Sequence, residues 1–280
     1  MKSISIKKRG KEYIDIPAKI KAVSGKVYEL SDEELGRGGN GCVYECMSND
    51  GFEYAVKFQL NLNQKAKARF EQEKKLLQKI NHPNLIKYID SGNVKDTNDE
   101  EIPFIVMEKA DKSLGEFLKG SGKVLYANYI YQFLGLAAAL EELHKYALHR
   151  DIKPENILVV GERWVISDFG LCSFLDEDHQ ELTGVDEKVG PKYWMSPEAL
   201  NHIYDQNISI SKASDVFQLA AIFWYVVTSR YPLGIVDSSD FDPQLSDLCN
   251  VLLKGLQNSP QKRIPNGEEL LKELNKIAFK

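Results

Sequence analysis

The sequence predicts an α+β protein with two lobes, a small strand-rich lobe followed by a larger and mainly helical one. Short strand-like segments occupy much of the first 109 residues, and apolar residues recur at helical spacing after that point. The chain has 280 residues, which is long enough for two lobes and a substantial core. Its 43% apolar and 28% charged residues are typical of globular proteins. We place the lobe boundary at residues 109–113.

The first lobe is expected to contain a β-hairpin, one main helix and two further strands. Residues 42–48 (CVYECMS) and 53–60 (EYAVKFQL) are strand-like, and the sequence NDG between them is a strong hairpin signal. Residues 66–80 carry apolar side chains at helical spacing, and the sequence NHPN ends that helix. The two further strands are expected at residues 85–92 and 103–109, joined by the polar loop NVKDTNDEE.

Helices dominate the predicted second lobe. They are expected at residues 128–146, 219–227 and 245–256. The longest apolar run of the chain, LAAIFWYVV at 219–227, is too short to cross a bilayer, which takes ~20 residues. We therefore interpret this run as a buried core helix.

The first 27 residues are interpreted as an N-terminal extension, ahead of a small lobe at 28–109 and a large lobe at 110–280. The sequence KSISIKKRGK is locally basic, and its isoleucines alternate with polar residues, which favours a solvated edge strand or tail. Three roles stay open: the extension adds a strand to the small lobe, caps the glycine-rich stretch GRGGNG, or remains mobile. No apolar stretch follows the basic residues, so a secretory signal is not expected.

Charge and cysteine content narrow the function classes. The formal net charge of −5 argues against general nucleic-acid binding, which depends on neutralising phosphates. The four cysteines, Cys42, Cys46, Cys172 and Cys249, show no paired CxxC spacing. We interpret them as reduced thiols of a cytoplasmic protein without a zinc site.

Three glycines in GRGGNGCVYE, Gly36, Gly38 and Gly41, precede a predicted strand. Glycine lets backbone amides approach a phosphate closely, so this stretch is a candidate phosphate site, with a flexible hairpin as the alternative. A dinucleotide-binding fold would need a helix after the glycines, and here a strand follows.

Two charged residues lie in or beside apolar strands. Burial of the Lys57 ammonium in AVKF requires a partner, for which Glu73 on the next helix is the candidate. A lysine that reaches the surface is the alternative. Asp168 ends an apolar strand and precedes Gly170, a position from which a carboxylate can hold a hard cation. A simple Asx-type turn is the alternative there.

The segment HRDIKPENIL, residues 149–158, places Asp151, Lys153 and Asn156 on one short turn between apolar segments. A buried strand would not tolerate these polar groups, and an amphipathic helix would not place proline in the middle of the run. The pattern indicates that a rigid turn holds these three side chains for a chemical purpose.

Over most of its length the chain resembles the eukaryotic-type protein kinases, with motifs in order and at the family's spacing. Glu73 precedes the HPN sequence as the family's helix glutamate does, and Asp-Phe-Gly follows at 168–170. MSPE stands for the usual A-P-E, Asp215 opens the buried helix, and Arg263 is expected to pair with Glu198. The resemblance implies a bilobal protein-kinase-like fold, with a small antiparallel β-sheet lobe that has one main helix and a larger, mainly helical lobe.

The resemblance also implies the chemistry, which is transfer of the γ-phosphoryl group of ATP to a protein hydroxyl with Mg²⁺ as cofactor. Asp151 is implied to orient the acceptor hydroxyl and take its proton, and Lys153 to steady the γ-phosphate. Asp168 and Asn156 are implied to coordinate Mg²⁺.

Nucleotide contacts are carried over in the same way. Lys57, held by Glu73, is implied to contact the α- and β-phosphates, which the glycines cover. Adenine is implied to lie between the lobes, with hinge backbone groups at its edge. The residues implied to bind the nucleotide are Gly36, Arg37, Gly38, Gly41, Val43, Ala55, Lys57, Met107, Glu108, Ala110 and Leu158.

Two features of the sequence point to different amino acids as the acceptor of the phosphoryl group. The catalytic loop, with lysine at position 153, resembles that of the serine/threonine class of kinases. Pro191 stands where that class has threonine, and together with Trp194 it resembles the substrate platform of tyrosine kinases. We expect a serine/threonine kinase that also phosphorylates itself through transient self-association, with dual or tyrosine specificity as the alternative.

Activation is expected to involve Arg150, which in the family belongs to a basic pocket for a phosphorylated residue. Glu187, with Asp186 beside it, occupies the common phosphosite position, and our hypothesis is that this acidic pair partly replaces the phosphate. Thr183 is the nearest phosphorylatable residue.

Protein substrates and ATP are the expected partners, without nucleic acid and without membrane insertion. A nucleotide-binding scaffold is the competing function, and a lost Lys57, Asp151 or Asp168 would favour it, but none is lost. His82 and His149 are interpreted as structural turn residues.

Other departures from the family pattern have smaller expected consequences. Segment 232–242 is short, which predicts a reduced substrate-docking region. Gln218 and Ala220 replace a more usual serine and glycine, which we interpret as a change in core packing. Cys42 and Cys172 are expected to border the ATP site, with inert small residues as the alternative.

Overall fold

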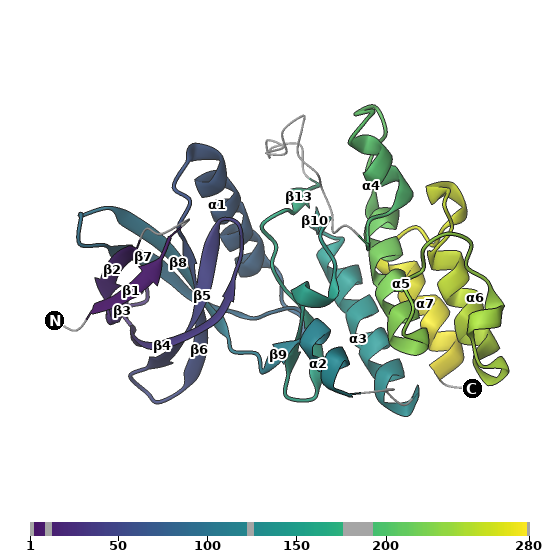
Figure 1. Cartoon of the computed structure of the whole chain (residues 1–280), viewed down its shortest axis with the longest axis horizontal. Coiled ribbons are helices and arrows are strands. Elements are labelled where there is room, and N and C mark those ends of the chain that lie inside the picture. The colour runs from purple at the N-terminus through teal and green to yellow at the C-terminus, as the bar shows by residue number, and fades with distance from the viewer. Residues whose placement is uncertain (1–2, 9–12, 122–125, 176–192, 279–280) are drawn as a thin grey trace. The chain divides into compact units, whose positions relative to one another are not determined.

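The computed structural model describes residues 3–8, 13–121, 126–175 and 193–278. The chain divides into two compact units, residues 1–79 with 86–110 and residues 80–85 with 111–280 (Figure 1). We call them the strand unit and the helical unit. A β-sheet with one helix makes up the first and helices dominate the second, as the predicted α+β fold requires.

A six-stranded antiparallel sheet forms the body of the strand unit, in the order β3-β4-β5-β6-β8-β7. Its strands are β3 (Lys19–Lys21), β4 (Val27–Arg37), β5 (Gly41–Ser48), β6 (Glu53–Gln59), β7 (Tyr88–Lys95) and β8 (Glu101–Glu108). The predicted hairpin of β5 and β6 turns at Gly51, whose φ of 84° suits glycine. The expected polar loop is shorter than predicted, because Val94 and Ile102 are paired and buried in β7 and β8.

The two faces of this sheet carry different side chains. Val43 pairs with Lys57, so these two side chains lie on one face. The neighbouring pair, Cys42 with Phe58, points to the opposite face and belongs to the hydrophobic core of the unit. The face with Lys57 is therefore available to polar chemistry, and the other face is sealed.

A two-stranded antiparallel ribbon, β1 (Ser3–Lys7) and β2 (Tyr13–Pro17), covers the sealed face. In Figure 1 it is the purple pair beside β7. Its inward side chains are at most 5% exposed, and they are Ile4, Ile6, Ile14 and Ile16. The prediction of a solvated edge strand or tail was wrong, because the alternating isoleucines pack on the sheet. β3 adds a strand to the small sheet, which is one of the three roles considered.

The main helix of the strand unit, α1 (Gln64–Lys79), follows β6. Asn63 caps it, since its Oδ1 accepts a hydrogen bond of 2.7 Å from the backbone N–H of Ala66. Phe70, Leu76 and Leu77 are buried, as their helical spacing predicted.

The helical unit is built around α5, which is buried along most of its length, as its apolar run predicted. Its helices are α2 (Leu114–Ser121), α3 (Tyr126–Leu143), α4 (Pro197–His202), α5 (Lys212–Thr228), α6 (Ser246–Gly255) and α7 (Gly267–Ala278). α3, α5 and α7 lie side by side (Figure 1), and the rings of Phe133 and Phe223 stack at 3.8 Å between α3 and α5. The short strands are β9 (Lys112–Ser113), β10 (Ala147–Leu148), β11 (Ile157–Val160), β12 (Arg163–Ile166) and β13 (Ser173–Phe174).

Two expectations about individual segments can be compared with the fold. Segment 232–242 contains a 3-10 turn, Ser238–Asp240, and no α-helix, and the reduced substrate docking expected there stays a prediction. Within the described ranges, no helix is both long enough and apolar enough to span a bilayer.

Gly41→Ala is expected to destabilise the strand unit, because a Cβ at this position would lie 2.0 Å from the carbonyl oxygen of Phe58. β5 and β6 would have to move apart locally, at a cost of about 1–3 kcal/mol. Gly38→Ala is the matched control, since no atom of the described residues lies within 4 Å of its Cβ position. Thermal unfolding measures both variants, and equal losses of Tm would contradict this prediction.

Candidate functional site

Lys57 on β6 and Glu73 on α1 form the ion pair that the sequence predicted. The Lys57 Nζ lies 2.7 Å and 2.9 Å from the two carboxylate oxygens of Glu73. The Glu73 side chain is 3% exposed and that of Lys57 is 19% exposed, so the lysine does not reach for the surface. The pair fixes one positive charge on the sheet face that also carries Val43.

The glycine-rich stretch connects β4 to β5 through residues 38–40. Gly41 is required by its close approach to β6, but Gly36 and Gly38 have no described atom within 4 Å of a Cβ position. Neither of these two glycines has a positive φ. Packing and backbone conformation therefore do not explain them, and they leave the backbone open to approach by a ligand.

Both ends of this stretch are tied to the strand unit. The Asn40 carbonyl oxygen accepts hydrogen bonds from the backbone N–H groups of Leu60 and Asn61, at 2.9 Å and 3.0 Å. At the other end, the Arg37 guanidinium donates to the Glu34 carboxylate and to the carbonyl oxygen of Lys7 on the ribbon. The hydrogen bond from Arg37 holds the pKa of Glu34 below its ordinary value. Arg37 thus contacts protein groups in this structure.

The Lys57 face of the sheet continues toward the end of β8. Ala55 pairs with Met107 in β8, so these two predicted adenine contacts occupy one row of the sheet. Glu108, another predicted contact, donates its backbone N–H to the carbonyl oxygen of Lys87 at 3.1 Å. Leu158 belongs to the helical unit, where it pairs with Val165.

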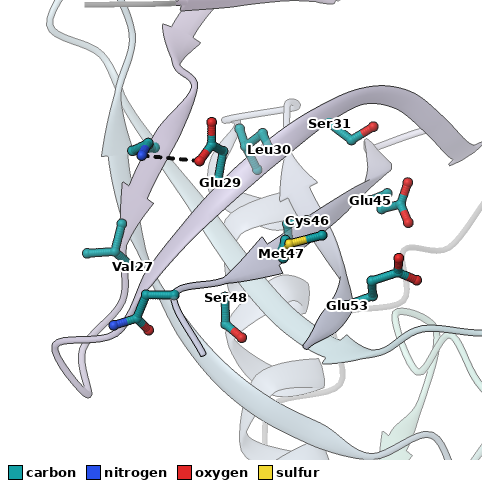
Figure 2. A pocket seen from close by; sticks show the side chains of 11 residues that line it. Val27, Glu29, Leu30, Ser31, Glu45, Cys46, Met47, Ser48 and Glu53 are labelled. Carbon is teal, nitrogen blue, oxygen red and sulfur yellow. Dashed lines mark ion pairs between the residues drawn. The ribbon is translucent and has the colours of Figure 1, made fainter. Parts of the chain in front are cut away.

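Lys109 lies between the predicted hinge residues, and sequence reasoning gave it no role. Its ammonium contacts Glu45 on β5 and lies 2.9 Å from Glu53 on β6. These hydrogen bonds raise the pKa of Lys109 above its ordinary value. Both glutamates line a pocket of about 390 Å³. Figure 2 shows Glu45 and Glu53 together on one side of it, with Val27 on the opposite side. The lysine therefore ties the end of β8 to β6, its neighbour in the sheet, and to β5 beyond it.

Asp151, Lys153 and Asn156 meet in the helical unit, on the turn that we call loop 149–156. Asp151 is 7% exposed. Its Oδ2 accepts hydrogen bonds from Lys153 Nζ at 2.8 Å and from Asn156 Nδ2 at 2.9 Å. Asn156 Nδ2 also donates to the Asp151 carbonyl oxygen at 2.9 Å. The three polar side chains therefore form one cluster, as the segment HRDIKPENIL predicted.

Asp215, at the start of α5, binds the backbone of this loop. Its carboxylate accepts hydrogen bonds of 2.8 Å from the backbone N–H groups of His149 and Arg150, and lies 3.1 Å from His144 Nε2. Burial alone would raise the pKa of Asp215, but the interaction with His144 and these backbone donors hold it below its ordinary value. The carboxylate therefore holds the backbone of His149 and Arg150 together.

Asn156 and Asp168 are the predicted metal ligands. Hydrogen bonds between Asn156 and Ser167, the residue before Asp168, join the two segments that carry them. The Asn156 carbonyl oxygen accepts from the backbone N–H and the hydroxyl of Ser167, at 2.8 Å and 2.9 Å. Asp168 has a φ of 61°, an unfavourable value for a residue with a side chain. Asn156 already uses its Nδ2 on Asp151, so its Oδ1 is the atom left for a cation. A carboxylate and an amide oxygen suit Mg²⁺.

Glu198 and Arg263 form the second ion pair that the sequence predicted. Arg263 Nη1 and Nη2 lie 2.6 Å and 2.9 Å from the two Glu198 oxygens, and the arginine side chain is 0% exposed. Ser214 also donates to Glu198, at 2.6 Å. Burial raises the pKa of Glu198, but the hydrogen bonds from Arg263 and Ser214 outweigh it and keep that pKa below its ordinary value.

Aromatic side chains gather beside the segment MSPE. Trp194 packs edge-on against Tyr225 at 5.6 Å between ring centroids and lies 5.1 Å from Tyr231. Tyr193 lies 5.5 Å from Tyr231, and both of these tyrosines are exposed. Pro191, the other half of the predicted platform, falls outside the described residues.

Several smaller expectations are also resolved. Cys42 does not border the Lys57 face, so that prediction was wrong: its thiol lies in the core, and burial raises its pKa to about 12. Cys172 is partly exposed, and its position at the ATP site stays a prediction. His149 is fully buried beside the carbonyl oxygen of Ser167, and His82 accepts from the backbone of Asn84, so both are turn residues as predicted.

The activation hypothesis concerns Thr183, Asp186 and Glu187, all of which lie outside the described residues. The structure does place Arg150, whose Nε donates to the carbonyl oxygen of Leu171 at 3.0 Å. The pairing of Arg150 with the acidic residues stays a prediction.

Comparison with known proteins gives a consistent result. The protein kinase domain family matches residues 30–278. Calcium-dependent protein kinase 3 of Plasmodium berghei is 30% identical over 261 residues, which cover 89% of this chain and 42% of that protein. A probable serine/threonine-protein kinase of Streptomyces coelicolor is 29% identical over 270 residues, or 88% of this chain and 39% of that protein. The mitogen-activated protein kinase kinase kinase ANP1 of Arabidopsis thaliana is 32% identical over 265 residues, or 85% and 38%.

The chain spans about two fifths of the length of these curated relatives. The family match covers most of the chain, and it includes the Lys57–Glu73 pair, loop 149–156 and the Glu198–Arg263 pair. The chain therefore belongs to the protein kinase family.

Proposed function

We propose that this protein is a serine/threonine kinase, which transfers the γ-phosphoryl group of ATP to hydroxyl groups of protein substrates and of its own chain. The geometry of loop 149–156 carries the proposal. There the Asp151 carboxylate lies 2.8 Å from the Lys153 ammonium and 2.9 Å from the Asn156 amide. A carboxylate held in this way suits a residue that orients a hydroxyl and accepts its proton.

Asp151, Lys153 and Lys57 then each have a part in the proposed transfer. Asp151 accepts a hydrogen bond from the acceptor hydroxyl and takes its proton as the new O–P bond forms, while the bond from the γ-phosphorus to the β,γ-bridging oxygen breaks and ADP leaves. Lys153, beside it, neutralises charge on the γ-phosphate. Lys57, held by Glu73, contacts the α- and β-phosphates. The opposite charges keep these side chains in place before substrate arrives, which is the main requirement for in-line phosphoryl transfer.

Asp168 and Asn156 are proposed to hold Mg²⁺, which when bound draws charge from the γ-phosphoryl group. Their carboxylate and amide oxygens are the hard donors that this ion prefers. The open backbone at Gly36 and Gly38 supports close approach of phosphates to the glycine-rich stretch.

Lys153 and the serine/threonine-protein kinase name of the Streptomyces coelicolor relative support serine or threonine as the acceptor. The aromatic cluster favours a second candidate, dual specificity, because the exposed rings of Tyr193 and Tyr231 offer an apolar surface on which a tyrosine ring can pack.

Incubation with Mg²⁺ and ATP labelled in the γ-phosphate, followed by mass spectrometry of the labelled peptides, tests the proposal. We expect label on serine or threonine residues of this chain or of an added protein such as casein. Label on tyrosine as well would establish dual specificity. Bound nucleotide with no label on any protein would contradict the proposed transfer and favour the scaffold function.

A further inference from the structure

The side chain of Gln218 on α5 contacts the backbone on both sides of Asp151. Its Oε1 accepts a hydrogen bond of 3.0 Å from the N–H of Ile152, and its Nε2 donates to the carbonyl oxygen of Arg150 at 3.2 Å. Gln218 is 2% exposed, so water does not compete for these hydrogen bonds. An amide suits this position because it combines an acceptor with donors in one side chain.

Gln218 follows Asp215 by three residues on α5, so the two side chains project from the same face of the helix. Asp215 binds the N–H groups of His149 and Arg150, and Gln218 continues from the Arg150 carbonyl to the Ile152 N–H. Together they hold the backbone of loop 149–156 from the residue before Arg150 to the residue after Asp151.

This support matters because Arg150 has a φ of 68°. The left-handed region is unfavourable for a residue with a side chain, and such a conformation persists only where its surroundings hold it. Asp215 contacts the loop up to the N–H of Arg150. The contacts of Gln218 begin at the Arg150 carbonyl and extend past Asp151, so they act where the strained residue leads into the carboxylate.

We infer that Gln218 is a positioning residue for the phosphoryl transfer proposed above: it fixes the backbone around Asp151 and so keeps that carboxylate beside Lys153 and Asn156. The inference rests on the proposed function of Asp151. It also corrects the interpretation of Gln218 as a change in core packing alone. Where the family more usually has serine, a shorter side chain could not span the Arg150 carbonyl and the Ile152 N–H.

Gln218→Met tests the inference, because methionine has a similar length and cannot replace either hydrogen bond. We expect kcat to fall by about 10- to 100-fold, since a small displacement of a catalytic group costs up to about 100-fold in rate. The KM for ATP and the number of nucleotides bound per chain should stay within about twofold, because the nucleotide contacts remain. Leu219→Met, at the adjacent buried position, is the matched control for packing and should keep kcat near the wild-type value.

A purely structural role for Gln218 predicts a different result. It would lower the fraction of folded protein but leave kcat per bound nucleotide unchanged, and that outcome for Gln218→Met would overturn the inference. If this variant does not fold, Gln218→Ser provides the same comparison, since serine is small and polar.

Amide hydrogen exchange of the wild-type protein provides a test that needs no phosphoryl transfer. The Ile152 N–H should exchange about as slowly as those of His149 and Arg150, which Asp215 protects. Fast exchange at Ile152 beside slow exchange at the other two would show that Gln218 does not hold the loop, whatever the activity of the protein. Slow exchange at Ile152 in a protein without kinase activity would count against the proposed function and leave the contact of Gln218 intact.

Discussion

Asp151→Asn should abolish most of the phosphoryl transfer while nucleotide binding persists. An asparagine side chain has nearly the same shape, but it cannot take a proton from the acceptor hydroxyl. General base catalysis contributes about 10²- to 10⁴-fold to a rate. We expect a loss within that range. In addition, Lys153 and Asn156 would lose the charged partner that lies 2.8–2.9 Å from them. Single-turnover transfer from labelled ATP to a protein substrate measures the rate.

The matched control for this prediction is Asp205→Asn, the same chemical change at an exposed position of the helical unit. It should leave the rate near the wild-type value. Nucleotide affinity of Asp151→Asn, measured by calorimetry, should change by less than about threefold, because the proposed phosphate contacts do not depend on proton transfer. If Asp151→Asn keeps more than about one tenth of the wild-type rate, another group accepts the proton.

Arg263→Ala should cost the helical unit about 3–5 kcal/mol of unfolding free energy, since it leaves a buried carboxylate without its counter-charge. Glu198 is 5% exposed, and Arg263 supplies both of its close cationic contacts. The arginine also donates to the carbonyl oxygens of Ala213 and Gln257, which would lose these hydrogen bonds. Chemical denaturation measures the change.

Lys254→Ala is the control for this second prediction, because it breaks the exposed Lys254–Glu273 pair in the same unit. Surface pairs of this kind contribute about 0–1 kcal/mol. Equal losses of unfolding free energy for Arg263→Ala and Lys254→Ala would mean that the buried pair stabilises the protein no more than the exposed pair does.

The pH dependence of stability follows from the same pair. The folded-state pKa of Glu198 is below its ordinary value of 4.5. Its contribution to stability is therefore fully present above that ordinary value, and it is lost as the pH falls through the lower, folded-state value.

The two ion pairs show what spacing along a sequence can predict. Lys57 lies in an apolar strand and Glu73 on the helix after it, so burial of the lysine required a partner and the helix offered one. Glu198 and Arg263 are 65 residues apart, and only the family resemblance joined them. In both cases the residue types were chemically complementary, so the predicted contacts matched the fold.

Gln218 and Lys109 show where such reasoning ends. The sequence gives the apolar run that follows Gln218, but the exact rotation of α5 decides whether this side chain meets the core or the backbone of Asp151. Lys109 looks like any solvated lysine until the sheet register brings Glu45 and Glu53 beside it. Both contacts depend on tertiary placement, which local pattern does not specify.

Because of the ribbon of β1 and β2, the packed core of the strand unit begins earlier in the chain than the region that matches the family. The family match starts at residue 30, but the core that supports the sheet starts at Ile4. A fragment trimmed to the matched region would lose five buried isoleucines, the four of the ribbon and Ile20 of β3, each worth ~1.5–3 kcal/mol. It would also expose the apolar face around Phe58, which favours aggregation. The segment shared with relatives is therefore smaller than the segment that must be produced to obtain a stable small lobe.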